Sequence, residues 1–242
     1  MNQINSPQSL SDIIGQKRIK ENLSIQIAAV MKRGGVLDHL LFCGPYGSGR
    51  STLAKVVANE MGVSIKVIDG KSLRSTHDLA AIFTNLNSGD ILLIEQIESL
   101  RKTSIEILYP AMENSSLDIV VGKGLSARSI RLKLPYFTII GTTSKLFQVD
   151  DRLKKNMFVY NLEPFEVDEI RRMILIFAKQ NEITIDEEAP YVLAMYSKQL
   201  PSEAFKLLLN VHKYAIARAN GIVTLEVSKD ALAILINHRN DT

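Results

Sequence analysis

The residues best suited to chemistry lie in the stretch GPYGSGRST, which runs from Gly44 to Thr52. Its spacing is that of a phosphate-binding loop, whose backbone N–H groups and following helix surround the phosphates of a nucleotide. Arg50 stands where such loops have lysine, and its wide planar guanidinium does not replace a compact ammonium between two phosphates. The alternative is an ordinary glycine-rich turn with a surface arginine. We predict weak binding of ATP or ADP through Gly44, Pro45, Tyr46, Gly47, Ser48, Gly49, Arg50, Ser51 and Thr52.

The apolar run DILLIE (90–95) holds the next candidates, because phosphate-loop hydrolases follow the loop with a strand that ends in Asp-Glu. Here the strand ends in Glu95 and Gln96. Glu95 and Ser51 are the candidate magnesium ligands, but the extra methylene of Glu95 does not suit the octahedral geometry that magnesium demands. Gln96 can orient a water but cannot take its proton, and a lost general base costs roughly 10²–10⁴-fold in rate. We predict that magnesium binding is weak or lost and that hydrolysis is lost, with Glu98 as a possible substitute base or a solvated surface carboxylate.

Apolar runs alternate with amphipathic segments over the first two thirds of the chain. Strands are predicted at 39–43, 63–68, 90–95, 137–143 and 157–162, and helices at 16–33, 51–61, 78–86 and 103–113. This alternation predicts an α/β fold with a parallel sheet. The segment 117–134 interrupts it with two strand-like arms around a Gly-Lys-Gly turn, which predicts an inserted β-hairpin.

From Val167 onward the sequence predicts only helices, near 167–180, 186–198, 201–219 and 228–237. We therefore expect a large domain over residues 1–163 and a small all-helical domain over residues 164–242. The join between them is the segment EPFEVDE.

The composition is that of an ordinary globular protein. Of 242 residues, 46% are apolar and 23% are charged, and the formal net charge of +3 is too small to predict a nucleic-acid surface by itself. Cys43 is the one cysteine, which excludes an internal disulfide and indicates a reducing compartment. The N-terminus lacks the pattern of a signal peptide and no apolar run is long enough to span a bilayer. We expect a cytoplasmic protein with no membrane contact.

From SLSDIIGQ (9–16) to about Ile236 the chain resembles the RuvB family, the AAA+ motors of Holliday-junction branch migration. The matching phrases include IIGQKRIKENL, DLAAIFTNLNSGDILLIEQI and LDIVVGKGLSARSIRLKLPYFTIIGTT. The resemblance implies a RecA-like AAA+ domain followed by a helical lid. It also implies a subunit of a homo- or hetero-oligomeric ring that acts in DNA recombination and repair.

Other positions depart from the pattern of the family. Where the pattern has a tyrosine near the adenine, this chain has Ile13, followed by Ile14. Thr143 keeps a polar group where the family senses the terminal phosphate. The resemblance therefore places Ile13 and Ile14 in the nucleotide site, and makes Thr143, Glu95 and Gln96 a degenerate catalytic set.

Two arginines that act on the nucleotide in the family have no counterpart. Lys155 or Asn156 stands at the place of the arginine finger, and Ser202 at that of the lid arginine. A finger acting in trans is worth roughly 10³–10⁵-fold in hydrolysis. The winged-helix DNA-binding domain of the family is not matched within this sequence, so we expect DNA contact through the complex and no tight binding by the chain alone.

The hairpin is where RuvA docks in the family. An exposed apolar edge on its two arms is predicted to dock a RuvA-like protein, an active RuvB, or both, through Leu117, Ile119, Val121, Ile130, Leu132 and Leu134. The alternative is that these residues pack on their own domain.

Three functions remain open from the sequence. The first is a RuvB-like pseudo-ATPase subunit of a recombination complex, which binds a nucleotide at most. The second is an active branch-migration ATPase with altered motifs. The third is a structural subunit of the clamp-loader type.

Overall fold

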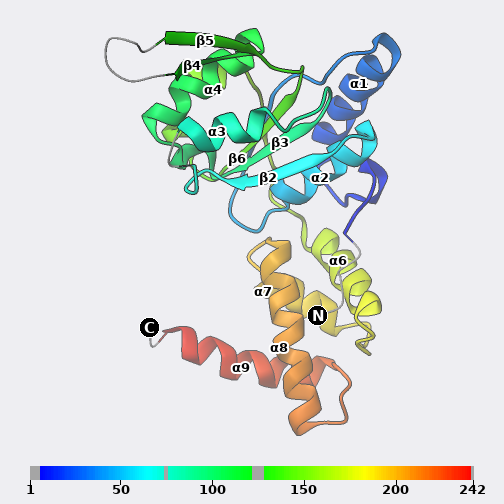
Figure 1. Ribbon diagram of the computed structural model, residues 1–242. Coiled ribbons are helices and arrows are strands. Elements are labelled where there is room, and N and C mark those ends of the chain that lie inside the picture. Colours follow the sequence, from blue (N-terminus) through cyan, green and yellow to red (C-terminus); the bar gives the residue numbers. More distant parts are fainter. Residues whose placement is uncertain (1–5, 74–75, 122–127, 241–242) are drawn as a thin grey trace.

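The computed structural model describes residues 6–73, 76–121 and 128–240, and within these it leaves out the side chains of 76–77, 119–121, 128–129 and 236–240. Figure 1 shows an α/β body above and a group of helices below, joined by the segment that leads into α6 (Val167–Gln180). The predicted fold class, an α/β parallel sheet followed by a helical segment, is confirmed.

The α/β body is built on a parallel sheet with the strand order β2-β3-β6-β1-β7. Each neighbouring pair in it runs parallel. Its strands are β1 (Leu40–Cys43), β2 (Ile65–Asp69), β3 (Ile91–Glu95), β6 (Thr138–Thr143) and β7 (Phe158–Asn161). Each strand overlaps the range that its apolar run predicts.

Helices cover both faces of the sheet (Figure 1). They are α1 (Lys17–Arg33), α2 (Arg50–Met61), α3 (Thr76–Phe83), α4 (Lys102–Asn114) and the short α5 (Asp151–Lys155). Successive residues of a strand face opposite sides. Leu40 and Phe42 of β1 therefore pack in one core with α1 and α2, whereas Leu41 packs in the other core with α3 and α4. Because both faces are filled, a ligand reaches this sheet at its ends.

The predicted hairpin lies between α4 and β6. Its arms are β4 (Ser116–Val121) and β5 (Arg128–Lys133), which pair antiparallel. Ile119 and Val121, two of the predicted docking residues, lie outside the described side chains.

The prediction of an apolar edge that is exposed along the whole hairpin is wrong at its base. Leu117 and Leu134 are 3% and 4% exposed, because both pack into the core that α3 and α4 share. Leu132 is half-buried, and Ile130 is 47% exposed. The apolar face of the hairpin thus begins in the domain core and reaches solvent at Ile130.

The helical body has a core of its own. Its helices are α6, α7 (Ala189–Tyr196), α8 (Pro201–Arg218) and α9 (Leu225–Asn240). The buried residues of this core extend from Phe165 to Leu232. The boundary between residues 163 and 164 stays a prediction. Within the described part of the chain, none of the helices combines the length and the apolar character that a bilayer crossing requires.

Asp186 contributes to the start of α7 at Ala189 rather than 186 and of α9 at Leu225 rather than 228, where Thr224 Oγ1 also accepts the N–H of Val227 at 3.2 Å. Asp186 Oδ1 accepts a hydrogen bond from the N–H of Ala189 at 2.7 Å, and Asp186 Oδ2 accepts one from the N–H of Leu225 at 2.7 Å. The N–H groups of a first helical turn have no partner within the helix. A single carboxylate therefore caps two helices that lie far apart in the sequence.

Replacing Asp186 with alanine is expected to lower the free energy of unfolding by about 1–3 kcal/mol, because loss of one N-cap costs about 0.5–2 kcal/mol. Urea unfolding followed by far-UV circular dichroism measures the change. The control is Glu187→Ala, an exposed neighbour whose loss should change stability by less than about 0.5 kcal/mol. Equal stability of the two variants would contradict the double cap.

Candidate nucleotide-binding site

The loop between β1 and α2 forms a cradle at the carboxyl end of the sheet. The N–H of Gly44 donates to the carbonyl of Thr143 at 3.1 Å, which ties the loop to the end of β6. Gly47 and Gly49 have φ angles of +85° and +91°, a region that glycine enters without steric cost. Gly49 is the N-cap of α2. The N–H groups of that first turn lack helical partners, so they are available to an anion.

The remaining loop residues differ in what their side chains contribute. The N–H of Ser48 donates to the carbonyl of Pro45 at 3.3 Å. The Ser48 hydroxyl is buried and has no hydrogen-bond partner among the described residues. Tyr46 is 82% exposed, so its side chain extends to solvent and only its backbone belongs to the cradle.

The structure brings the two predicted metal ligands together. Ser51 Oγ donates a hydrogen bond directly to Glu95 Oε1. Ser51 lies in the first turn of α2 and Glu95 is the last residue of β3. The two oxygens that would flank a metal ion are thus bonded to each other.

Arg50 is buried, with 8% of its surface exposed, which rules out the alternative of a surface arginine. Burial lowers the pKa of its guanidinium, while the charges of Glu98 and Glu95 act in the opposite direction. Arg50 Nη1 and Glu98 Oε2 are both buried without a hydrogen-bond partner in the part of the chain that the structure describes. Buried polar groups are normally paired, so these two atoms are exceptions that single out this site.

The other candidate catalytic residues meet at the same edge. Gln96 follows β3 in a left-handed conformation, with a φ of +52°. Thr143 is fully buried at the end of β6, and its Oγ1 accepts the N–H of Lys145 at 2.9 Å. Because β6 lies between β3 and β1, the ends of the three strands are neighbours. Glu95 bonds to Ser51 and Thr143 accepts from Gly44, so both border the cradle, and Gln96 is the residue that follows Glu95.

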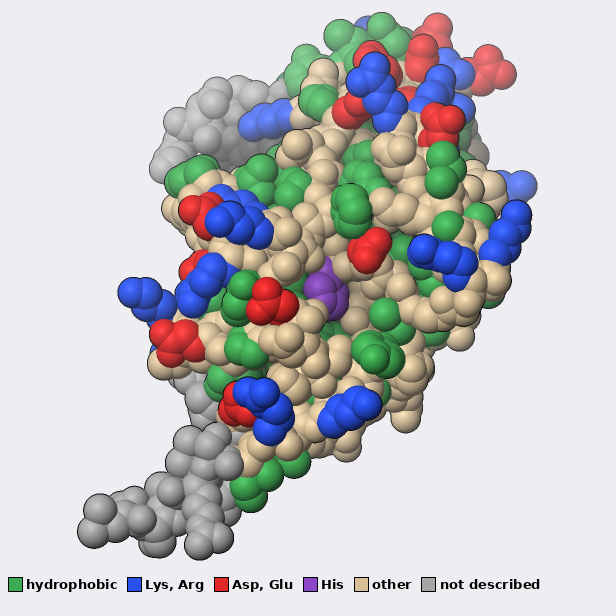
Figure 2. Space-filling view, turned by 90° about the horizontal axis from the view of Figure 1, so that it is seen from above, with side chains coloured by type: hydrophobic (Ala, Val, Ile, Leu, Met, Phe, Trp, Pro, Cys, Tyr) green, Lys and Arg blue, Asp and Glu red, His purple; other side chains and the backbone are tan. Residues whose placement is uncertain are grey.

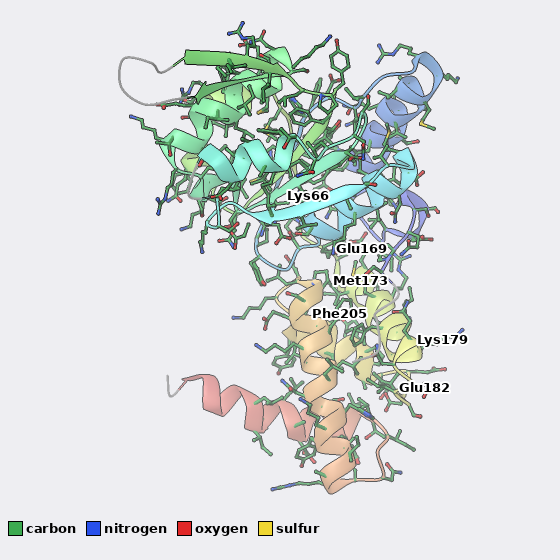
Figure 3. All side chains as sticks on the ribbon, viewed as in Figure 1. Lys66, Glu169, Met173, Lys179, Glu182 and Phe205 are labelled. Carbon is green, nitrogen blue, oxygen red and sulfur yellow. The ribbon has the colours of Figure 1, made fainter. Side chains whose placement is uncertain are left out.

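A cleft of about 730 Å³ opens beside the cradle, between the two bodies. Ile13 and Ile14 line it together with Thr52 from the loop helix. The opposite wall includes Met173 of α6 and Phe205 of α8, which Figure 3 shows at the end of the helical body nearest the sheet. Apolar walls next to a phosphate cradle suit a nucleotide, whose base is flat and apolar on both faces.

Sequence reasoning missed the helical wall and two contacts that fix it. Gln16 Nε2 donates to the carbonyl of Glu163 at 2.7 Å, and Gln16 Oε1 accepts the N–H of Glu163 at 3.0 Å. This pair fixes the Ile13–Gln16 turn against the join between the bodies. The dipeptide Gly15-Gln16 was the available signal, but neither the burial of Gln16 nor its left-handed φ of 51° is visible in a sequence.

The second contact joins α8 to the cradle. The N–H of Ser202 donates to the carbonyl of Gly47 at 3.4 Å. A β-carbon on Gly47 would lie 1.8 Å from Ser202 Oγ, so only glycine fits there. The residue at the place of the lid arginine thus touches the loop through its backbone and its hydroxyl.

Helix α5 carries the segment in which an arginine finger is expected. Arg152 pairs with Asp150 at 3.0 Å, and Lys154 pairs with Asp151 at 2.7 Å. These cations are held by carboxylates at the start of their own helix, whereas Lys155 is exposed.

Comparison with known proteins adds to this geometry. The family model "Holliday junction DNA helicase RuvB P-loop domain" matches residues 5–162. The Holliday junction branch migration complex subunit RuvB of Dehalococcoides mccartyi (strain CBDB1) is 41% identical over 230 residues, which cover 95% of this chain and 66% of that protein. The chain therefore spans slightly less than two thirds of the length of this relative.

Solved structures give the same result. The Thermotoga maritima RuvB Holliday junction branch migration motor has a TM-score of 0.85 and 29% identity, over 96% of this chain and 74% of that one. A point mutant of the same protein has a TM-score of 0.86 and 30% identity, over 95% of this chain and 73% of that one. The sequence match and the shared architecture lead to one conclusion: the chain belongs to the RuvB family.

Proposed function

We propose that this chain is an AAA+ subunit of a Holliday junction branch migration complex that binds ATP or ADP weakly and does not hydrolyse it. The observation that carries the proposal is an intact phosphate cradle around a buried Arg50, with Gln96 where a general base is needed. The cradle retains the backbone groups that bind phosphates, whereas the side chains that would drive hydrolysis are replaced.

Several missing groups support the loss of hydrolysis. Gln96 has no basic atom, and a general base is worth roughly 10²–10⁴-fold in rate. Ser202 carries no charge towards the cradle, although the N-terminus of its helix contacts Gly47. Magnesium binding is proposed to be weak or lost, because Ser51 and Glu95 bond to each other.

An active branch-migration ATPase is the second candidate, and one observation favours it. Glu98 has a buried carboxylate oxygen without a partner in the described chain, and its charge acts on Arg50. A carboxylate in such a position is a candidate general base. If Glu98 serves in this way, Glu98→Gln abolishes turnover.

The proposed partner is a RuvA-like protein that docks on the free end of the hairpin. Ile130 offers an exposed β-branched side chain there, beside the half-buried Leu132. An apolar anchor of this kind in the centre of a contact commonly contributes about 2 kcal/mol or more. Through such a contact, and as a member of a homo- or hetero-oligomeric ring, the chain would modulate a motor that it does not power.

DNA is proposed to be reached through the complex. Figure 2 shows the face turned away from the helical body, where Lys and Arg side chains alternate with Asp and Glu. Within the hairpin, Arg131 is paired with Asp118 at 2.8 Å. Interspersed charges of this kind provide only weak, salt-sensitive attachment to a phosphate backbone.

The wild-type chain is expected to bind ATP without steady turnover. Restoring the family's residues together, as Arg50→Lys, Glu95→Asp and Gln96→Glu, should tighten ATP binding in magnesium about tenfold. Hydrolysis should gain less, because no arginine finger or lid arginine is restored. Titration with a fluorescent ATP analogue and a phosphate-release assay measure the two effects. Steady turnover by the wild type that Ser51→Ala abolishes would refute the proposed loss of hydrolysis.

Placing a charge at the free end of the hairpin, as Ile130→Asp, should weaken binding to a purified RuvA-like protein at least about tenfold. The matched control is Val67→Asp on β2, since Val67 is 45% exposed and lies outside the hairpin. Thermal unfolding of both variants separates lost docking from lost folding. If the wild type binds an active RuvB instead, the partner is that subunit, and if it binds neither at micromolar concentration the docking proposal fails.

A further inference from the structure

We infer that the guanidinium of Arg50 takes the place of a divalent metal ion in this site, so that a nucleoside di- or triphosphate binds without magnesium. The inference rests on the proposed nucleotide binding and identifies the cation that accompanies the phosphates. Its basis is the arrangement of Arg50, Ser51, Glu95 and Glu98 around the cradle.

The residues present do not fit a magnesium ion. Magnesium requires near-ideal octahedral geometry and keeps several of its waters, so its ligands must leave an open space of fixed size. Ser51 Oγ and Glu95 Oε1, the two predicted ligands, are joined by a direct hydrogen bond. The longer side chain of Glu95 makes this contact directly from the end of β3, so a metal ion between the two oxygens would have to break it.

A positive charge is already built into the same place. Arg50 is the first residue of α2 and is 8% exposed, so its guanidinium is withdrawn from solvent. The charges of Glu98 and Glu95 both act on it. An arginine stays protonated at neutral pH. A divalent cation at this position would be repelled by the guanidinium and would compete with it for the same carboxylates.

The guanidinium of Arg50 also has a nitrogen donor without an acceptor in the described chain. Arg50 Nη1 is buried with no hydrogen-bond partner in the described chain, and the buried hydroxyl of Ser48, two residues earlier in the loop, likewise has none. A guanidinium presents its N–H groups as a planar fork that matches phosphate oxygens in pairs. Nη1 is enclosed by the protein, so the loop must shift before a phosphate oxygen can accept from it; the guanidinium would then supply positive charge to the phosphates, as a metal ion does in a magnesium-dependent site.

Lysine at this position would behave differently. Its ammonium is a compact point charge with no planar fork, so it would not fill the space between the carboxylates and the phosphates. Arg50→Lys should therefore make nucleotide binding depend on magnesium. The substitution keeps the charge and a good helix former at the start of α2, which limits its effect on folding.

The test is titration of the full chain with a fluorescent ADP analogue, in excess magnesium chloride and in excess EDTA. The wild-type Kd should differ by less than about threefold between the two conditions, whereas the Kd of Arg50→Lys should rise at least about tenfold in EDTA. Arg33→Lys is the matched control, because Arg33 is exposed at the far end of α1, and it should behave as the wild type does. Thermal unfolding confirms that each variant is folded.

The outcomes separate this inference from the function on which it rests. If the wild type binds the analogue only in magnesium, the inference is wrong and the proposed nucleotide binding stands. If Arg50→Lys binds equally well in EDTA, the guanidinium is not the substitute cation, and the inference is again wrong. If no binding occurs in either condition, the proposed nucleotide binding fails and the inference fails with it.

Discussion

The buried guanidinium of Arg50 is the constraint on which the candidate site depends. A charge taken out of water is costly unless other charges and hydrogen bonds compensate for it. Here the charges of Glu98, in the turn after β3, and Glu95, at the end of β3, offset part of the cost of burial, and both residues lie more than forty positions away along the chain. The cradle, the end of β3 and the turn that follows it must therefore be positioned together, and the rigid end of the sheet positions all three.

The helical body depends on the same region from the other side. Its α8 contacts the cradle at Gly47, and the join before α6 is held by the side chain of Gln16. One contact is made to the backbone of Gly47 in the cradle and the other to the backbone of Glu163 in the join. The contacts therefore fix the path of the main chain at both places. A nucleotide in the cleft would touch both bodies, and its binding is thereby coupled to their relative position.

Much of the architecture could be predicted from the sequence, because a parallel sheet buried on both faces leaves continuous apolar runs such as LLFC and ILLIE. The phosphate cradle could also be predicted from the sequence, because Gly44, Gly49 and Ser51 have the fixed spacing of such loops. The cleft wall was not, because Met173 and Phe205 reach the site only through tertiary packing. The hairpin was misjudged at Leu117 for a related reason: alternation identifies an apolar face but not how much of it the domain covers.

Two of the predicted departures from the family pattern, Arg50 and Glu95, lie in separate segments of the chain but belong to one site. In the order β3-β6-β1, the ends of three strands are side by side, so the start of α2 after β1 lies against the end of β3, where Ser51 bonds to Glu95 and the charge of Glu95 acts on Arg50. Arginine in place of lysine at position 50, with aspartate kept at position 95, would crowd a metal ion bound by that aspartate. A longer anion at position 95 alone would displace that ion without replacing its charge. Arg50 and Glu95 each keep the charge of the family's residue on a longer side chain, and the charge of Glu95 acts on Arg50, so the two substitutions bear on the same site.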